Sequence, residues 1–207
     1  MYNNPIGDVM KLILSSCDFL NENSRKRILE NIKKPLDKNK VLFIPSVPYR
    51  INNLDKYYKR LELDGFKKEN VYIFNEHEVN KFINLDLDLI YVGGGNTFST
   101  LKKIKETKFD KYIINYLKNK VIYIGGSCGA HIVSSNIEHV LNFDLNSVNL
   151  EDFTGLNLFN GIIIPHFDNS REIVYQDLIK ENKYKVYTLT DNATIIATDN
   201  KIKIYDN

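Results

Sequence analysis

The chain has 207 residues, 43% of them hydrophobic and 26% charged, which predicts one globular domain with a substantial core. A formal net charge of +2 with scattered lysines argues against a nucleic-acid-binding surface, and the longest apolar runs are too short for a membrane span. The two cysteines, Cys17 and Cys128, form neither a disulfide framework nor a metal-binding spacing. We therefore expect a cytoplasmic protein without metal, cofactor, nucleic-acid partner or membrane partner.

The start of the chain lacks the basic segment and long apolar stretch of a signal peptide. Because the first strand-like run begins directly after Met10, residues 1–9 are predicted to be an N-terminal extension. The remainder, residues 10–207, contains no linker, repeat or low-complexity segment and is expected to form a single domain.

Short apolar runs rich in β-branched residues recur along the chain. They predict strands over 11–16, 40–46, 70–75, 88–94, 121–127 and 161–167. Amphipathic spacing predicts helices over 24–34, 53–64, 97–118 and 170–182, with Ser24 and Ser170 as N-caps. The continuous apolarity of the strands indicates a mainly parallel sheet covered on both faces, hence an α/β fold. The runs after residue 184 predict short strands that form a terminal antiparallel hairpin.

A first glycine cluster, "YVGGGNTF" over 91–98, lies where a predicted strand ends. It has neither the dinucleotide-binding glycine spacing nor the phosphate-binding lysine motif. Its exposed backbone N–H groups could stabilise a developing oxyanion. The competing interpretation is a turn that starts a helix, capped by Asn96 or Thr97.

A second cluster, "VIYIGGSCGAHI" over 121–132, holds two candidate nucleophiles side by side. Gly125, Ser127 and Gly129 fit the G-x-S-x-G nucleophile elbow, which exposes its central side chain on a sharp turn between strand and helix. Reading the motif one residue later puts Cys128 at the apex but satisfies only one glycine position. The serine frame is therefore favoured, with Cys128 contributing its backbone N–H and packing its thiol inward.

A serine nucleophile needs a base, and the chain has four histidines. His166 follows an apolar strand in "IIIPHFDN" and is expected to share the carboxyl edge of the sheet with Ser127. His77, His131 and His139 are expected to be structural or solvated.

Together "VGGGNTF", the G-x-S-x-G-A elbow and "PHF" resemble peptidase family S51, which contains aspartyl dipeptidase (peptidase E) and cyanophycinase. The resemblance covers the chain from residue 11 and implies a class I glutamine-amidotransferase-like three-layer α/β sandwich. It implies serine hydrolysis of dipeptides or short peptides, chiefly those with an N-terminal aspartate. Ser127 and His166 match the nucleophile and base, and Gly94, Gly95 and Cys128 match the oxyanion region. Cysteine stands after the nucleophile where alanine is common in the family.

The acid that orients His166 is left open among three residues. By the resemblance, Asp191 in "TLTDNAT" is preferred over Asp144, and Asp168 is a third option because it lies two residues after His166. Arg171 matches a family arginine that can pair with an acidic substrate side chain, and its alternative is a surface arginine. Asn96 is also placed among the substrate-binding residues.

Two other functions stay open. Cys128 could be the nucleophile of a glutaminase-like reaction on the same fold, or the chain could be a catalytically inactive peptide-binding member of the family. A homodimer is left open as well.

Overall fold

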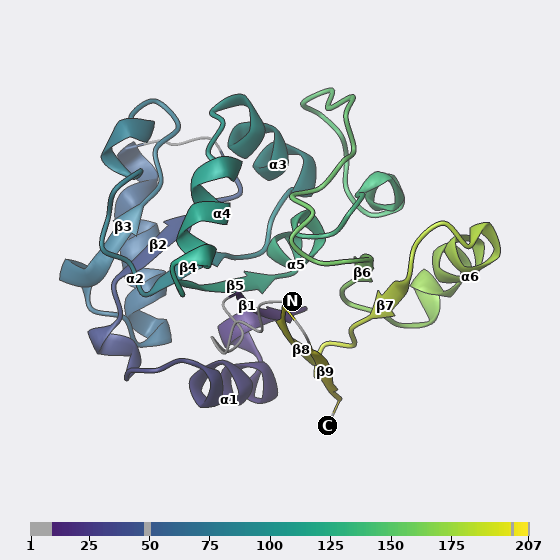
Figure 1. Cartoon of the computed structure of the whole chain (residues 1–207), viewed down its shortest axis with the longest axis horizontal. Coiled ribbons are helices and arrows are strands. Elements are labelled where there is room, and N and C mark those ends of the chain that lie inside the picture. Colours follow the sequence, from purple (N-terminus) through teal and green to yellow (C-terminus); the bar gives the residue numbers. More distant parts are fainter. Residues whose placement is uncertain (1–9, 48–50, 200, 207) are drawn as a thin grey trace, which may run out of the picture.

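The computed structural model describes residues 10–47, 51–199 and 201–206, which form a sheet flanked by helices (Figure 1). The predicted extension over residues 1–9 lies outside the described residues. No helix among those described combines the length and the apolarity that crossing a bilayer requires.

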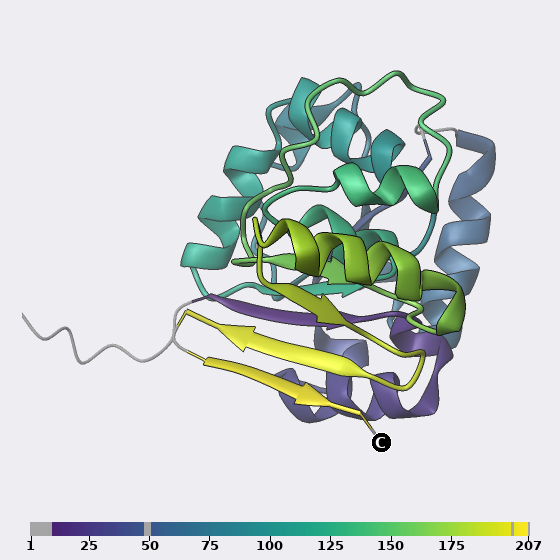
Figure 2. The ribbon, with the colours of Figure 1, turned by 90° about the vertical axis from the view of Figure 1, so that its right-hand side faces the viewer.

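The main sheet has seven strands in the order β3-β2-β4-β5-β1-β8-β9. These strands are β3 (Val71–Ile73), β2 (Val41–Ile44), β4 (Leu89–Val92), β5 (Ile122–Gly126), β1 (Lys11–Ser15), β8 (Thr194–Thr198) and β9 (Lys201–Tyr205). The first five are parallel, β8 is antiparallel to β1, and β9 is antiparallel to β8. The expected mainly parallel sheet and C-terminal hairpin are thus confirmed, and the hairpin extends the sheet beside β1 (Figure 2).

Alternate residues of the strands supply two hydrophobic cores, one on each face of the sheet. In β4, Ile90 and Val92 pack in the core formed by α3 (Thr97–Glu106), α4 (Asp110–Lys118) and α5 (Cys128–Ile132). Leu89 and Tyr91 pack in the opposite core, to which α1 (Glu22–Asn31) and α2 (Leu54–Asp64) contribute Ile28 and Leu61. This burial on both faces explains the continuous apolarity of the strands and gives the three layers.

The helix predicted over 97–118 is two helices, because the chain turns at residues 107–109. Lys108 adopts a positive φ of 57°, and the Thr107 hydroxyl donates to the Lys103 carbonyl at 2.7 Å, which closes the end of α3. Phe109 is fully buried and anchors the start of α4.

Both predicted serine caps are wrong. Asn21 caps α1, because its side-chain oxygen accepts from the backbone N–H groups of Asn23 and Ser24. Ser170 lies in a 3-10 turn, Asn169–Arg171, which precedes α6 (Glu172–Glu181) and is capped by Asp168. In each case a carboxylate or amide oxygen earlier in the chain satisfies the free N–H groups.

The strand before His166 does not belong to the main sheet. β6 (Ile162–Ile164) pairs in parallel with β7 (Val186–Thr188) in a separate two-stranded sheet, connected by α6 at one side of the molecule (Figure 1). The expectation that His166 ends a strand of the main sheet is therefore wrong, and the run that starts at Lys185 is not part of the hairpin. Because parallel strands need a long crossover, the 170–182 helix fits between β6 and β7.

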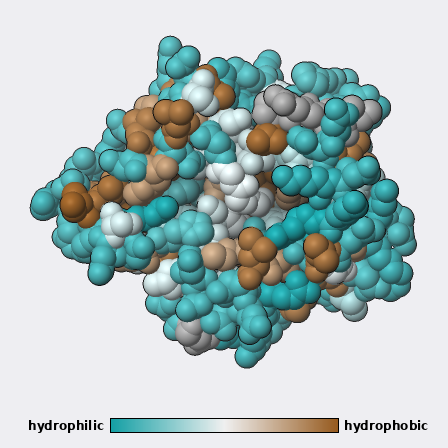
Figure 3. Space-filling model, turned by 180° about the vertical axis from the view of Figure 1, so that it is seen from behind, coloured by the Kyte–Doolittle hydropathy of each residue, from teal (hydrophilic) through white to brown (hydrophobic). Residues whose placement is uncertain are grey.

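Exposed large apolar side chains are scattered over the surface, and on the face shown in Figure 3 they form separate small groups. Among the described residues visible on that face, the exposed apolar side chains do not join into one patch that would mark a subunit interface. The homodimer stays a prediction.

Candidate active site

Ser127 lies on a strained turn between β5 and α5. Its backbone has φ 48° and ψ −104°, a conformation that residues other than glycine rarely adopt. Its N–H donates to the Ser15 carbonyl at the end of β1 at 2.9 Å. The turn is therefore tied to the central strands, and the Ser127 side chain is half-buried at their carboxyl ends.

Gly125 and Gly129, two positions before and after Ser127, are required by close backbone contacts. A Cβ atom at Gly125 would lie 2.6 Å from the Gly129 carbonyl oxygen, and one at Gly129 would lie 2.1 Å from the Val92 carbonyl oxygen. Neither space admits a side chain. Both glycine positions of the serine frame therefore have a steric reason.

His166 reaches Ser127 from the small sheet. Its backbone N–H donates to the Ser16 hydroxyl at 2.9 Å, and that hydroxyl lies 3.0 Å from the carbonyl oxygens of Leu189 and Thr190. This anchor brings the end of β6 against the end of β1. As a result, His166 Nε2 lies 3.0 Å from Ser127 Oγ.

Among the three candidate acids, Asp191 is the one that contacts His166. Asp191 Oδ1 lies 2.6 Å from His166 Nδ1. Asp144 instead accepts from the Thr97 N–H at 2.8 Å, and Asp168 accepts from the Ser170 N–H at 2.9 Å. The geometry thus favours Asp191, and the aspartate reaches the imidazole with a short hydrogen bond.

The first glycine cluster borders the elbow. A Cβ atom at Gly94 would lie 3.7 Å from Ser127 Cβ, so this segment runs beside the nucleophile. Gly95 has a φ of 138°, and a Cβ there would overlap Ser46 Oγ at 1.8 Å. Asn96 caps α3 by accepting from the Ser99 N–H and donates from Nδ2 to the Leu145 carbonyl. The structural alternative for Asn96 is therefore confirmed, and its role in substrate binding stays a prediction.

The Cys128 thiol points away from the elbow. It is 1% exposed and lies 3.2 Å from the Thr100 hydroxyl in the core. Burial is the main cause that raises the pKa of Cys128 to about 12. At neutral pH the side chain is therefore a protonated thiol, which is a poor nucleophile.

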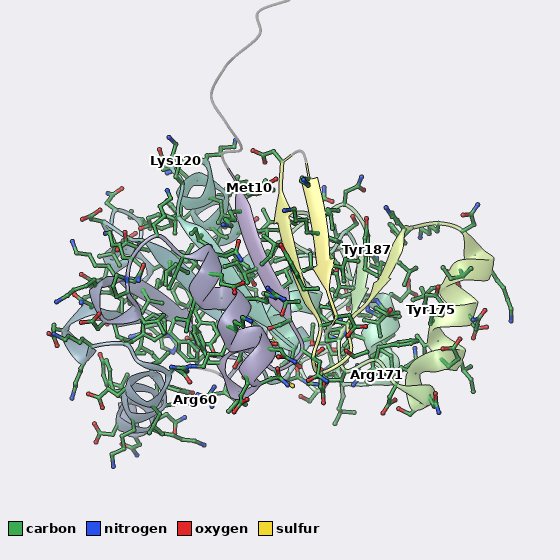
Figure 4. The ribbon with its side chains drawn as sticks, turned by 90° about the horizontal axis from the view of Figure 1, so that it is seen from below. Met10, Arg60, Lys120, Arg171, Tyr175 and Tyr187 are labelled. Carbon is green, nitrogen blue, oxygen red and sulfur yellow. The ribbon has the colours of Figure 1, made fainter. Side chains whose placement is uncertain are left out.

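Arg171 is the last residue of the 3-10 turn that leads into α6, and Figure 4 labels it at that end of the helix. One guanidinium nitrogen donates to the Pro165 carbonyl at 2.8 Å, and the group stacks on the Phe143 ring at 4.1 Å. Burial lowers its pKa, against the opposite influence of Asp168, Asp144 and Asp191. In the part of the chain that the structure describes, however, no carboxylate forms a salt bridge with Arg171.

His131 and His139 are buried structural residues, as expected, whereas the His77 side chain is 73% exposed. The two buried rings lie 5.2 Å apart and close to Phe143. Desolvation lowers the pKa of His139 to about 4 and that of His131 well below its ordinary value. Both rings are therefore neutral at pH 7.

Sequence reasoning missed two site residues, Ser16 and Cys17. The hydroxyl of Ser16 joins the ends of β1, β6 and β7 through hydrogen bonds. Cys17 lies next to Asp191. A signal existed, because both residues directly follow a central parallel strand, where α/β proteins place their sites.

A cavity beside α3 does not coincide with this site. One of about 340 Å³ is lined by α3 and its surroundings, including Ser99, Lys103 and Val148, and contains none of Ser127, His166 or Asp191. The candidate site is therefore identified by its hydrogen bonds and backbone geometry.

Hydrolases are the class of protein in which a Ser–His–Asp hydrogen-bond chain is found at a nucleophile elbow of an α/β fold. Residues 11–205 match the family model of Peptidase family S51. The chain belongs to this family.

The relatives agree with the family assignment. An uncharacterized peptidase of Listeria monocytogenes is 35% identical over 121 residues, which are 56% of this chain and 58% of that protein. Peptidase E of Escherichia coli is 37% identical over 111 residues, 53% of this chain and 48% of that protein. The chain thus spans between 48% and 58% of the length of these curated relatives.

Two solved structures match nearly the whole chain. A candidate peptidase E protein from Listeria monocytogenes matches 96% of this chain and 98% of its own, with a TM-score of 0.76 and 26% identity. A peptidase from an acI-B1 Actinobacterium matches 97% of this chain and 88% of its own with a TM-score of 0.65, and at 16% identity it supports the fold alone.

Proposed function

We propose that this chain is a serine peptidase that hydrolyses dipeptides or short peptides, with Ser127 as nucleophile, His166 as base and Asp191 as orienting acid. The observation that carries the proposal is the continuous chain of two hydrogen bonds, 3.0 Å from Ser127 to His166 and 2.6 Å from His166 to Asp191. Each contact lies within the reach that proton transfer and imidazole orientation require.

The reaction begins when His166 Nε2 accepts the Ser127 hydroxyl proton as Oγ attacks the scissile carbonyl carbon. Asp191 holds the Nδ1–H tautomer and stabilises the imidazolium that forms. The N–H of Cys128, at the start of α5, and an N–H of the Gly94–Gly95 segment are the proposed donors to the oxyanion. The imidazolium then protonates the leaving amine, and water hydrolyses the acyl-enzyme by the reverse proton path.

Arg171 supports a preference for an N-terminal aspartate in the substrate. Its guanidinium is held in place by Phe143 and the Pro165 carbonyl but has no salt bridge among the described residues. A substrate carboxylate could therefore form a bidentate contact that the protein itself leaves unmade. This agrees with the substrate class that the family resemblance implies.

Hydrolysis of a panel of X-Leu dipeptides by the purified chain and by Ser127→Ala tests the proposal. We expect release of leucine by the wild type, most strongly from Asp-Leu, and a loss of at least about 10³-fold in Ser127→Ala. A serine-reactive fluorophosphonate probe should label the wild type and not the variant. Full activity in Ser127→Ala would reject the mechanism, and absence of both hydrolysis and labelling would favour the inactive peptide-binding alternative.

A further inference from the structure

Three potential metal ligands converge behind the proposed base. Cys17, His166 and Asp191 each offer one ligand atom, and these three atoms lie within 4.8 Å of one another. They are far apart in the sequence and follow three different strands, β1, β6 and β7. No local spacing of residues could have indicated this group.

The three ligands are held by one hydrogen-bonded centre, the Ser16 hydroxyl. Ser16 directly precedes Cys17, accepts from the backbone N–H of His166, and lies 3.0 Å from the carbonyl of Thr190, the residue before Asp191. Because each ligand is at or next to a residue bound to Ser16, their backbones cannot separate without breaking this centre. The donor set is therefore preorganised.

We propose that Cys17, His166 and Asp191 form an inhibitory binding site for Zn²⁺. A thiolate sulfur, an imidazole nitrogen and a carboxylate oxygen are the three donor types that zinc selects, and three protein ligands leave a fourth position for water. Cys17 and His166 are partly exposed and Asp191 is exposed, so an ion can enter from solvent.

Only small movements are required to bind the ion. Tetrahedral zinc with bonds of about 2.0–2.3 Å separates its ligand atoms by roughly 3.3–3.7 Å. The distance between His166 Nδ1 and Asp191 Oδ1, now 2.6 Å, must increase to this range. The Cys17 sulfur, which lies within 4.8 Å of both atoms, must lie at a similar distance from them. Side-chain rotation of the exposed aspartate can supply this change.

The ion would inactivate His166 as a base by changing which ring nitrogen carries the proton. Zinc takes the Nδ1 lone pair of His166, so the imidazole proton moves to Nε2, and the Cys17 thiol releases its proton to solvent. The Asp191 carboxylate exchanges its hydrogen bond for a metal bond. With Nε2 protonated, His166 has no lone pair to accept the Ser127 proton.

Cys17 is protonated in the metal-free protein. Burial, and next the charge of Asp191, raise the pKa of its thiol to about 11. The thiol is therefore not an active nucleophile at neutral pH, but a dication displaces such a proton outright.

Titration with Co²⁺, a spectroscopic substitute for zinc, tests the site without any activity measurement. We expect one Co²⁺ per chain, with a thiolate-to-cobalt charge-transfer absorption that Zn²⁺ abolishes by displacement. Cys17→Ala should lose this absorption, whereas Cys128→Ala and Ser127→Ala should keep it. Absence of the absorption from the wild type, or its persistence in Cys17→Ala, would overturn the site. Far-ultraviolet circular dichroism verifies that each variant is folded.

The inhibitory effect rests on the proposed serine mechanism and needs a second measurement. Zn²⁺ should slow fluorophosphonate labelling of Ser127 at least about tenfold, and EDTA should restore it. In Cys17→Ala the labelling rate, relative to the same variant without metal, should respond at least tenfold more weakly to zinc. Cobalt binding with unchanged labelling would reject inhibition while leaving the site, and absence of labelling without metal would reject the proposed function alone.

Discussion

Cys128 Sγ lies 3.2 Å from the Thr100 hydroxyl, so the thiol beside the proposed nucleophile faces the core. The serine mechanism requires only the backbone N–H of Cys128. We therefore expect Cys128→Ala to retain most of the hydrolytic activity, and to lose about 1 kcal/mol of stability for the deleted sulfur. Dipeptide hydrolysis together with urea denaturation measures both. A collapse of activity in the folded variant would support a thiol mechanism instead.

Asp191 and Asp144 can be separated by paired substitutions. Asp191→Asn removes the negative charge that holds the Nδ1–H tautomer of His166 and stabilises the imidazolium, and should lower kcat by about 10³-fold. Asp144→Asn removes only a negative charge that lies away from His166, and its amide oxygen can still accept from the Thr97 N–H at the start of α3, so kcat should change by less than about fivefold. Steady-state kinetics at constant pH decides between them. The reverse order would make Asp144 the functional acid.

Arg171→Met should affect acidic substrates selectively. A charge-assisted hydrogen bond contributes about 1.5–3 kcal/mol, so kcat/KM for Asp-Leu should fall by about 10–150-fold. A dipeptide whose N-terminal side chain is uncharged, such as Ala-Leu, makes no such contact and provides the internal control. An equal loss for both dipeptides would assign Arg171 a structural role, through its stacking on Phe143.

Acid should destabilise the fold through His139. Its pKa is about 4 in the folded protein against an ordinary value of 6.5, so the unfolded chain binds the proton more readily. Stability is therefore full above about pH 6.5 and decreases as the pH falls toward 4, by at most about 3 kcal/mol from this group. Urea denaturation at pH 7 and 4.5 should show a smaller decrease in His139→Gln. If the wild type and His139→Gln lost the same stability between pH 7 and 4.5, His139 would not be a source of the acid destabilisation.

Two glycines near Ser127 should respond differently to alanine. In Gly129→Ala the new methyl group would lie 2.1 Å from the Val92 carbonyl oxygen, which is fixed in β4, and should cost about 3 kcal/mol or more. Gly94 is exposed, and its nearest neighbour would lie at 3.7 Å, so Gly94→Ala should change the free energy of unfolding by less than about 1 kcal/mol. Denaturation midpoints provide the comparison. Similar stability of the two variants would contradict the packing at the elbow.

Local sequence predicted the central strands and the nucleophile elbow because both depend on short-range physics. Continuous apolarity indicates burial on both faces, and the glycines at 125 and 129 follow from backbone contacts near the turn. The same patterns misjudged the helix over 97–118, because the positive φ of Lys108 and the burial of Phe109 leave no periodic signal. They also could not show that β6 and β7 leave the main sheet.

The sequence by itself predicted the fold class and the turn at Ser127, and it singled out His166 as the candidate base. The family resemblance preferred Asp191, but only the tertiary structure shows that it is the one of the three aspartates in contact with His166, since that contact depends on Ser16 joining the ends of β1, β6 and β7. The same contacts bring Cys17 beside both His166 and Asp191, although these lie 149 and 174 residues further along the chain. Hydrogen bonds between segments so distant in the chain have no local periodicity, and they exist only once the two sheets are packed together.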